Sequence, residues 1–157
     1  ILYGEKNIDN TWASISRPEL SARGESGLCI YVPGPGSSDK VMMDGAKVYS
    51  EAVRKMINML EKSCRREHIA IEELDLVVPH QANQRIIDAI RNRIQLPDEK
   101  VFSNIRNLGN TSSSTIPLAL SELMESRNPG EYIGLCAFGG GFTFGAAILK
   151  THQNNKS

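Results

Sequence analysis

The chain has 157 residues, of which 40% are hydrophobic and 23% are charged, and its 18 basic residues balance 18 acidic ones. This length fits one domain, and the apolar fraction is enough for a buried core, which excludes a wholly disordered chain. Zero net charge argues against a nucleic-acid-binding protein, and no apolar run approaches the roughly 20 residues that a membrane span needs.

The first 44 residues are rich in glycine and proline. Short β-prone runs, at Ile1–Tyr3, Thr11–Ile15 and Leu28–Val32, alternate with these residues, and Pro33-Gly34-Pro35-Gly36 marks a firm break. Such a pattern predicts strands joined by long turns. We therefore interpret residues 1–44 as a variable excursion that leads into a domain of residues 45–150.

From Gly45 onward the pattern is that of alternating helices and strands. Apolar residues recur every three or four positions up to Arg65, which predicts a long amphipathic helix. The β-branched run Leu74–Val78 predicts a strand, a second helical face ends before Pro97, and Val101–Asn104 predicts a further brief strand.

The last third of the chain begins with a polar cluster. A helix is predicted over Ile116–Met124, with Thr111 or a neighbouring serine as its cap. Tyr132–Phe138 and Phe142–Leu149 predict two strands, and the polar residues 151–157 predict a disordered tail. The resulting order αβαβαββ from residue 45 indicates an α/β layered domain.

The three cysteines, Cys29, Cys64 and Cys136, are odd in number and widely spaced. They show no spacing typical of a zinc site or a disulfide framework, so we expect free thiols, no metal and a cytoplasmic location. All three lie in apolar surroundings, which predicts core packing rather than catalysis. The chain has no initiator Met, and we expect it to be part of a longer protein.

Three motifs stand where predicted strands end. His80 follows a buried-type strand, Asn110 precedes a helix, and Gly139-Gly140-Gly141 joins the last two strands. Singly, each has a simpler interpretation: a structural histidine, a turn or capping residue, and a tight hairpin. Together, a neutral imidazole and an amide NH₂ can donate to one enolate oxygen, as when a malonyl thioester loses CO₂, and glycine N–H groups suit a second oxyanion.

These motifs resemble those of a known family. Pro79-His80-Gln81-Ala82-Asn83, Gly109-Asn110-Thr111-Ser112-Ser113 and the run Phe138–Gly145, together with Met43–Tyr49, are similar to the C-terminal half of 3-oxoacyl-[acyl-carrier-protein] synthase III. The resemblance runs in order from about residue 41 to residue 149. It implies an α/β, thiolase-like fold, in which this chain forms the C-terminal half of a five-layered αβαβα architecture with a mixed sheet packed with helices.

The resemblance also implies a Cys-His-Asn triad. His80 and Asn110 match its last two members, and Gly140 matches the glycine whose N–H shares the oxyanion hole with the nucleophile. The family's cysteine lies in its N-terminal half, outside this chain, so this chain alone is expected to be inactive. The whole protein is expected to be an acyltransferase of fatty acid biosynthesis that condenses an acyl thioester with malonyl-acyl carrier protein and releases CO₂.

Further positions match the family's binding residues. Gly45 and Asn83 match positions along the pantetheine arm, and Arg85 matches a position at the tunnel mouth that meets the acidic carrier protein. The implied substrates are thioesters of CoA or acyl carrier protein, without a cofactor, and the implied partners are acyl carrier protein and a second copy in a homodimer. For Arg91 and Arg93, a solvated helix face and a functional role are equally good interpretations.

Two other functions stay open on the sequence. An acyltransferase of the same fold would move an acyl group to an alcohol or amine with His80 as general base. A non-catalytic half would only shape a heterodimer or bind carrier protein, although the intact set of candidate residues argues against it. We also expect the isolated chain to expose the apolar face of its long helix, including Met56, Ile57 and Leu60, and to associate.

Overall fold

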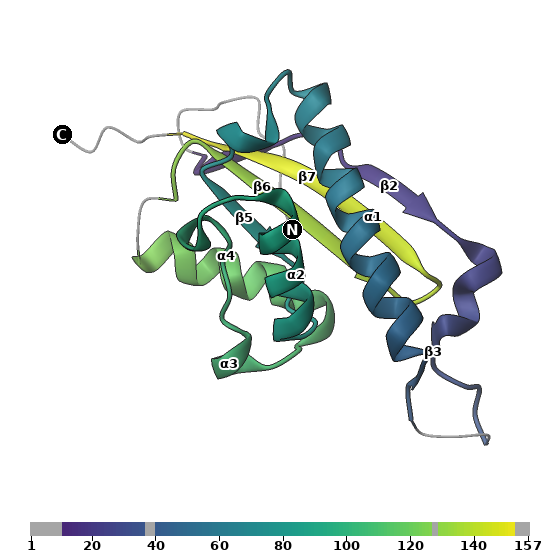
Figure 1. The fold of residues 1–157 in the computed structure, drawn as a ribbon. Helices are drawn as coiled ribbons and strands as arrows, with labels where there is room; N and C mark the ends of the chain where they lie inside the picture. Colours follow the sequence, from purple (N-terminus) through teal and green to yellow (C-terminus); the bar gives the residue numbers. More distant parts are fainter. Residues whose placement is uncertain (1–10, 37–39, 127–128, 153–157) are drawn as a thin grey trace.

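The computed structural model describes residues 11–36, 40–126 and 129–152. In chain order its elements are β1 (Ala13–Ile15), β2 (Glu19–Ala22), β3 (Ile30–Tyr31), β4 (Met42–Met43), α1 (Gly45–Arg66), β5 (Leu76–Pro79), α2 (Gln84–Ile94), α3 (Ile105–Leu108), α4 (Thr115–Ser126), β6 (Tyr132–Gly139) and β7 (Thr143–Thr151). The main sheet has the order β1-β7-β6-β5 with β2 also paired to β7, and β3 and β4 form a separate hairpin (Figure 1).

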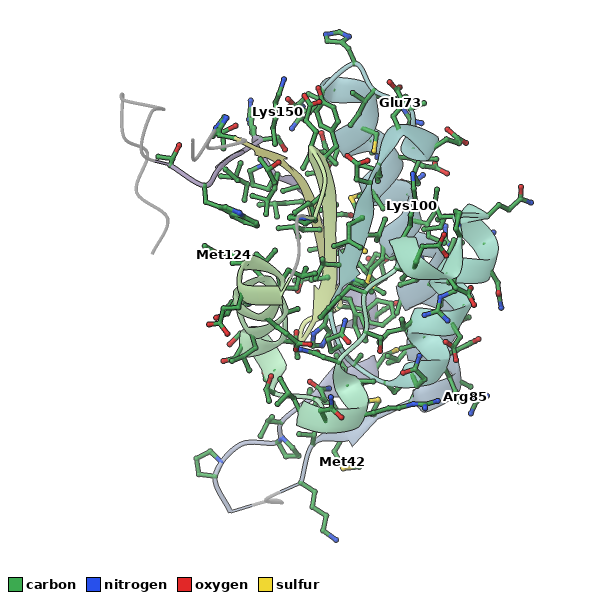
Figure 2. All side chains as sticks on the ribbon, turned by 90° about the vertical axis from the view of Figure 1, so that its left-hand side faces the viewer. Met42, Glu73, Arg85, Lys100, Met124 and Lys150 are labelled. Atoms are coloured by element: carbon green, nitrogen blue, oxygen red, sulfur yellow. The ribbon has the colours of Figure 1, made fainter. Side chains whose placement is uncertain are left out.

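Helices cover both faces of the main sheet. β5 runs parallel to β6, whereas β1, β2 and β6 all run antiparallel to β7. α1 and α2 lie on one face and α4 lies on the other (Figures 1 and 2). The chain is therefore α/β with a mixed sheet packed with helices, as the sequence predicts.

α1 is the long amphipathic helix that the apolar spacing predicts, and it ends one residue after the expected Arg65. Asp44 caps its first turn, because its Oδ1 atom accepts a hydrogen bond from the backbone N–H of Lys47 at 3.1 Å. Arg65 and Arg66 stand in the last turn, where cations interact favourably with the helix dipole. In the described ranges no helix joins enough length to enough apolar character to cross a membrane.

The apolar face of α1 is buried within this chain. Met56 and Leu60 have no exposed surface and Ile57 is 7% exposed, because they pack over β6 and β7. The expectation that this face would lie open is therefore wrong. Exposed apolar side chains do occur on the other face of the sheet, where Leu118 and Met124 of α4 are 40% and 54% exposed, and Figure 2 labels Met124.

The close approach of α1 to the sheet requires a glycine in β6. A Cβ atom at Gly134 would lie 2.7 Å from Leu60 Cδ1 and 2.9 Å from Leu74 Cδ1. Both leucines are fully buried, so neither methyl group can turn out into solvent. The absence of a side chain at this position lets the helix lie directly on the strand.

The segment before residue 45 joins the main sheet rather than standing apart from it. β1 pairs Ala13 with Thr151, and β2 pairs Glu19 with Ala146. Residues 13–22 therefore share one sheet with the predicted domain of residues 45–150.

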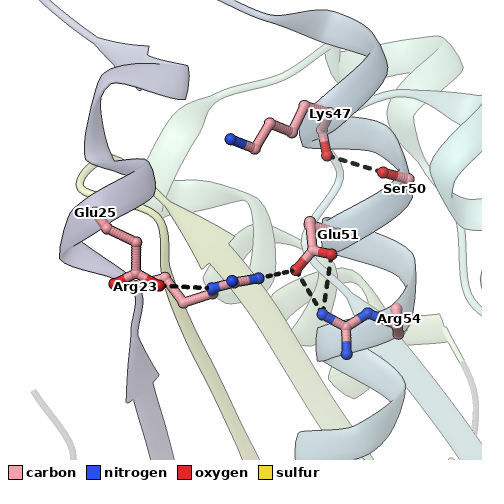
Figure 3. Close-up of polar contacts among 6 residues, drawn as sticks. All are labelled: Arg23, Glu25, Lys47, Ser50, Glu51 and Arg54. Atoms are coloured by element: carbon pink, nitrogen blue, oxygen red, sulfur yellow. Dashed lines mark hydrogen bonds and ion pairs between the residues drawn. The ribbon is translucent and has the colours of Figure 1, made fainter.

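An ion-pair network ties the end of β2 to α1. Arg23 donates to Glu51 at 3.0 Å and to Glu25 at 3.3 Å, and Glu51 also accepts from Arg54 (Figure 3). The Arg54 guanidinium, more than that of Arg23, lowers the pKa of Glu51. Partly exposed pairs of this kind add little stability individually, but together they hold the strand beside the helix.

Three local expectations differ from the structure. Val101 makes only an isolated bridge to Val77, and the brief strand predicted at Val101–Asn104 does not form. The chain turns away because the backbone N–H of Asn104 donates to the side-chain oxygen of Gln81 at 3.1 Å instead of to a strand.

The start of α4 also differs. No side chain caps it at Thr111, and a 3₁₀ turn at Ser112–Ser114 leads into the helix instead.

The sequence predicts a disordered tail from residue 151 onward, but residue 151 still belongs to β7. Thr151 is the last residue of β7 and is buried, and the backbone N–H of His152 donates to the carbonyl of Trp12 at 2.8 Å. These contacts form because β1 pairs with the C-terminal end of β7. The strand predicted at Ile1–Tyr3 lies outside the described residues.

Replacing Gly134 with alanine should destabilise the protein. The added methyl group would overlap Leu60 and Leu74, and overpacking of a filled core costs about 1–3 kcal/mol. Urea unfolding of the wild type and of Gly134→Ala measures this loss. Gly24→Ala is the matched control, because nothing lies within 4 Å of a Cβ atom there. Equal unfolding free energies for the two variants would show that the leucines can repack.

Candidate active site

All six site residues named from the sequence line one open depression. It has a volume of about 1020 Å³ and lies where the ends of β5 and β6 meet the starts of α1 and α2. The six residues are Gly45, His80, Asn83, Arg85, Asn110 and Gly140. Arg85 and Met42 mark this end of the molecule in Figure 2, with Lys150 at the opposite end.

His80 directly follows β5 and is held by the neighbouring strand. Its backbone N–H donates to the carbonyl of Cys136 at 2.8 Å, and its ring packs edge-on against Phe138 at a centroid distance of 5.4 Å. Ring atom Nδ1 lies 2.6 Å from Thr115 Oγ1. Burial lowers the pKa of His80, so the imidazole is neutral at pH 7, and Nε2 has no partner among the described residues.

Asn110 lies in an exposed turn with its amide oriented by the backbone. Its Oδ1 atom accepts a hydrogen bond from the N–H of Ser112 at 2.9 Å. The turn needs unusual backbone angles, with Gly109 at φ 69° and Ser112 at φ 59°. No hydrogen bond of the described residues uses the Asn110 NH₂ group, which is therefore available as a donor.

Gly140 lies in the turn between β6 and β7. Its carbonyl accepts a hydrogen bond from the hydroxyl of Thr143 at 3.2 Å, and Gly141 adopts φ 72°. No described atom lies within 4 Å of a Cβ atom at Gly140, so the packing of this chain does not require glycine there. The missing side chain instead leaves the backbone open to a molecule in the depression.

Asn83 and Arg85 line the depression, and each also makes a contact within the fold. Asn83 Oδ1 accepts from the backbone N–H of Ile86 at 2.9 Å and so caps α2. The Arg85 guanidinium lies over the Tyr49 ring, 5.6 Å from its centroid, which holds the cation at the rim. Arg91 pairs with Asp88 at 3.1 Å, and it lies outside the depression.

The sequence contains little indication of one wall of the depression, because only Met43 among its residues lies in a motif named above. This wall is apolar and comes from Ile30, Val41 and Met43, in and beside the β3–β4 hairpin. These residues lie in or next to the segment interpreted as a variable excursion, and short apolar runs between prolines carry no local signal of a binding role. Thr115, which contacts His80, was likewise not singled out.

None of the three cysteines lines the depression. Burial raises the pKa of Cys64 to about 11 and that of Cys136 to about 12, so both stay protonated and unreactive at neutral pH. Core packing is confirmed for these two, whereas Cys29 is only half-buried. Across the described ranges no group of three or more potential ligand side chains is placed to hold a metal ion.

Comparison with known proteins identifies the family. The profile described as 3-Oxoacyl-[acyl-carrier-protein (ACP)] synthase III C terminal matches residues 64–151, more than half of the chain. This chain belongs to the 3-oxoacyl-[acyl-carrier-protein] synthase III family. It is 40% identical to the beta-ketoacyl-[acyl-carrier-protein] synthase III of Oleidesulfovibrio alaskensis, in a match that covers 96% of this chain and 50% of the relative.

Solved structures of synthase III proteins share the fold. The enzyme from Aquifex aeolicus superposes with a TM-score of 0.82 at 34% identity, over 90% of this chain and 46% of that one. The Thermus thermophilus protein gives a TM-score of 0.82 at 33% identity, over 89% of this chain and 47% of that one. The thiolase-like α/β fold is thus confirmed, and the chain spans about half the length of the synthase III relatives that it matches.

Because burial lowers the pKa of His80, its ring should titrate below the usual 6.5. At a pH between the two values, the unfolded chain binds more protons than the folded one. His80 therefore contributes stability that is fully present above about pH 6.5 and is lost as the pH falls through the folded-state pKa. Ring NMR titration, with His80→Asn to assign the signal, measures this. Titration at or above 6.5 would contradict the burial of the ring.

Proposed function

We propose that this chain supplies the decarboxylation and condensation groups of a synthase III acyltransferase of fatty acid biosynthesis. The observation that carries the proposal is the shared depression, which His80, Asn110 and Gly140 all line. The names of the relatives support acyl carrier protein as the carrier of one substrate.

The first step is loss of CO₂ from a malonyl thioester. The bond between the carboxylate and the central carbon breaks, and its electron pair moves into the thioester, which places negative charge on the carbonyl oxygen. His80 Nε2–H and the Asn110 NH₂ group donate to that oxygen and stabilise the enolate. A neutral imidazole suits this role, because an imidazolium is acidic enough to protonate the carbanion before it reacts.

The second step forms the new carbon–carbon bond. The enolate carbon attacks the carbonyl of an acyl group held as a thioester on a cysteine, and the resulting tetrahedral oxyanion accepts from the Gly140 N–H. Collapse of this intermediate expels the thiolate and leaves a 3-oxoacyl thioester. In the family the nucleophilic cysteine lies in the N-terminal half, and Cys64 and Cys136, which are buried with raised pKa values, are poorly suited to replace it.

The walls of the depression suit the pantetheine arm of such thioesters. Val41 and Met43 offer apolar contact, and Gly45 offers backbone without a side chain. Arg85 places a cation at the rim, where an acidic carrier protein would dock. A homodimer of the whole protein remains a prediction.

His80→Ala and Asn110→Ala should each reduce malonyl decarboxylation by about 10²–10³-fold, the usual cost of losing one oxyanion donor. Loading of the acyl group onto the cysteine should persist, because it uses other groups. Release of labelled CO₂ and acylation by labelled acetyl-CoA would be measured side by side, in a protein that joins this chain to the family's N-terminal half. Asn107→Ala is the control, since this exposed asparagine lies outside the depression.

Equal loss of both activities in both variants would refute this division of roles. If the unmodified protein released no CO₂ but transferred its acyl group to an alcohol or amine, the alternative with His80 as general base would replace condensation.

Arg85→Glu should weaken the use of carrier-protein substrates while turnover of small thioesters stays near the wild-type value. A charge at the rim acts mainly on the association rate, so we expect roughly a tenfold rise in KM at low salt that shrinks at high salt. Lys62→Glu makes the same charge change on an exposed part of α1, away from the depression. The docking role of Arg85 would be rejected if the two variants gave the same KM and the same salt dependence.

The chain alone should form no acyl adduct. Incubation with radiolabelled acetyl-CoA is expected to leave Cys64 and Cys136 unmodified, because burial keeps both thiols protonated. Addition of the family's N-terminal half should bring labelling. A stoichiometric adduct on any cysteine of this chain would instead make the chain a self-contained enzyme.

A further inference from the structure

We infer that Thr115 is a positioning residue that holds His80 in the tautomer with its proton on Nε2. Thr115 is the first residue of α4, is 3% exposed, and places Oγ1 2.6 Å from His80 Nδ1. The activity part of this inference rests on the function proposed above, whereas the tautomer is a property of the chain itself.

The assignment follows from counting donors and acceptors. If Nδ1 carried the proton, it would donate to Oγ1, and the Thr115 hydroxyl proton would then need a second acceptor. The hydrogen bonds of the described residues provide none, and a buried donor without a partner is unfavourable. If the hydroxyl donates to Nδ1, its proton is used and the ring proton resides on Nε2.

The surroundings hold both groups in this arrangement. The Thr115 side chain is 3% exposed, so the surrounding core leaves its hydroxyl little room to turn away from the ring. The edge-on contact with Phe138 limits rotation of the ring from another side. Nε2, which has no partner in the described part of the chain, is thereby left for the depression that the ring lines.

One short segment therefore controls both neutral donors. Asn110 presents its NH₂ group at the start of the turn, and the 3₁₀ turn Ser112–Ser114 leads directly to Thr115. Movement of this segment would change the orientation of the amide and the proton position on the imidazole together. Without the hydroxyl, both tautomers become accessible, and the Nδ1–H form presents only a lone pair at Nε2, which repels an enolate oxygen.

The tautomer can be read from the ring nitrogens by ¹⁵N NMR near neutral pH. The wild type should show protonated Nε2 and unprotonated Nδ1. Thr115→Val removes the hydroxyl at equal size and should give a mixture of tautomers, whereas Thr115→Ser keeps the donor and the wild-type pattern. Ser114→Ala, one residue earlier and exposed, should change nothing. A wild-type ring protonated on Nδ1 overturns the inference without any variant, even if Thr115→Val fails to fold.

Kinetics give a second readout in a protein that joins this chain to the N-terminal half. Thr115→Val should lower kcat for malonyl decarboxylation about tenfold, the effect of about one hydrogen bond, with little change in KM, and Thr115→Ser should restore it. A folded Thr115→Val protein with the wild-type tautomer and kcat would refute the role of the hydroxyl. An active His80→Ala protein would refute the proposed function instead, and the tautomer assignment would stand.

Discussion

Strands β5 and β6 run parallel and end at the same edge of the sheet, where the backbone N–H of His80 donates to the carbonyl of Cys136 at 2.8 Å. This pairing places the residue after β5 beside the glycine turn after β6. Loops that follow parallel strands meet at one edge, which is where α/β proteins commonly bind ligands. The positions of α2 and α4 depend on it, because α2 begins just after His80 and α4 packs against β5 from the other face.

The groups in the centre of the depression at this edge are neutral, and a charged side chain stands at its rim. The imidazole of His80 is kept neutral by burial, and the other inner donors are an amide and a peptide N–H. Under the proposed function, such neutral donors would stabilise a developing oxyanion without holding the substrate carboxylate in an ion pair, which would oppose the loss of CO₂. Arg85, the charged residue among those that line the depression, lies over the Tyr49 ring.

Packing explains why this edge is held firmly. α1 lies directly on the sheet because Gly134 has no side chain, and the core on that side continues from α1 into α2, which Asn83 caps at the depression. On the opposite face a smaller core joins α4 to β5, and this core positions Thr115 against His80. The two histidine contacts that matter most, to Cys136 and Thr115, thus come from the sheet and from a helix on its far face.

The sequence by itself determined the long helices, the strands β5, β6 and β7, and the motifs. Apolar spacing predicted α1 within one residue of its end, and the three motifs named His80, Asn110 and Gly140, which all line one depression. It did so because helix and strand periods, and the polar or glycine residues that end them, are local properties of the chain.

Only the tertiary structure decided which segments meet. It buried the face of α1 that includes Leu60, brought Thr151 into a strand beside Ala13, and replaced the strand predicted at Val101–Asn104 with a turn tied to Gln81. It also built the apolar wall of the depression from the hairpin and placed Thr115 against His80. Periodicity reports that a face will be covered, but the covering partner depends on the pairing and register of residues far apart in the chain, which no local pattern contains.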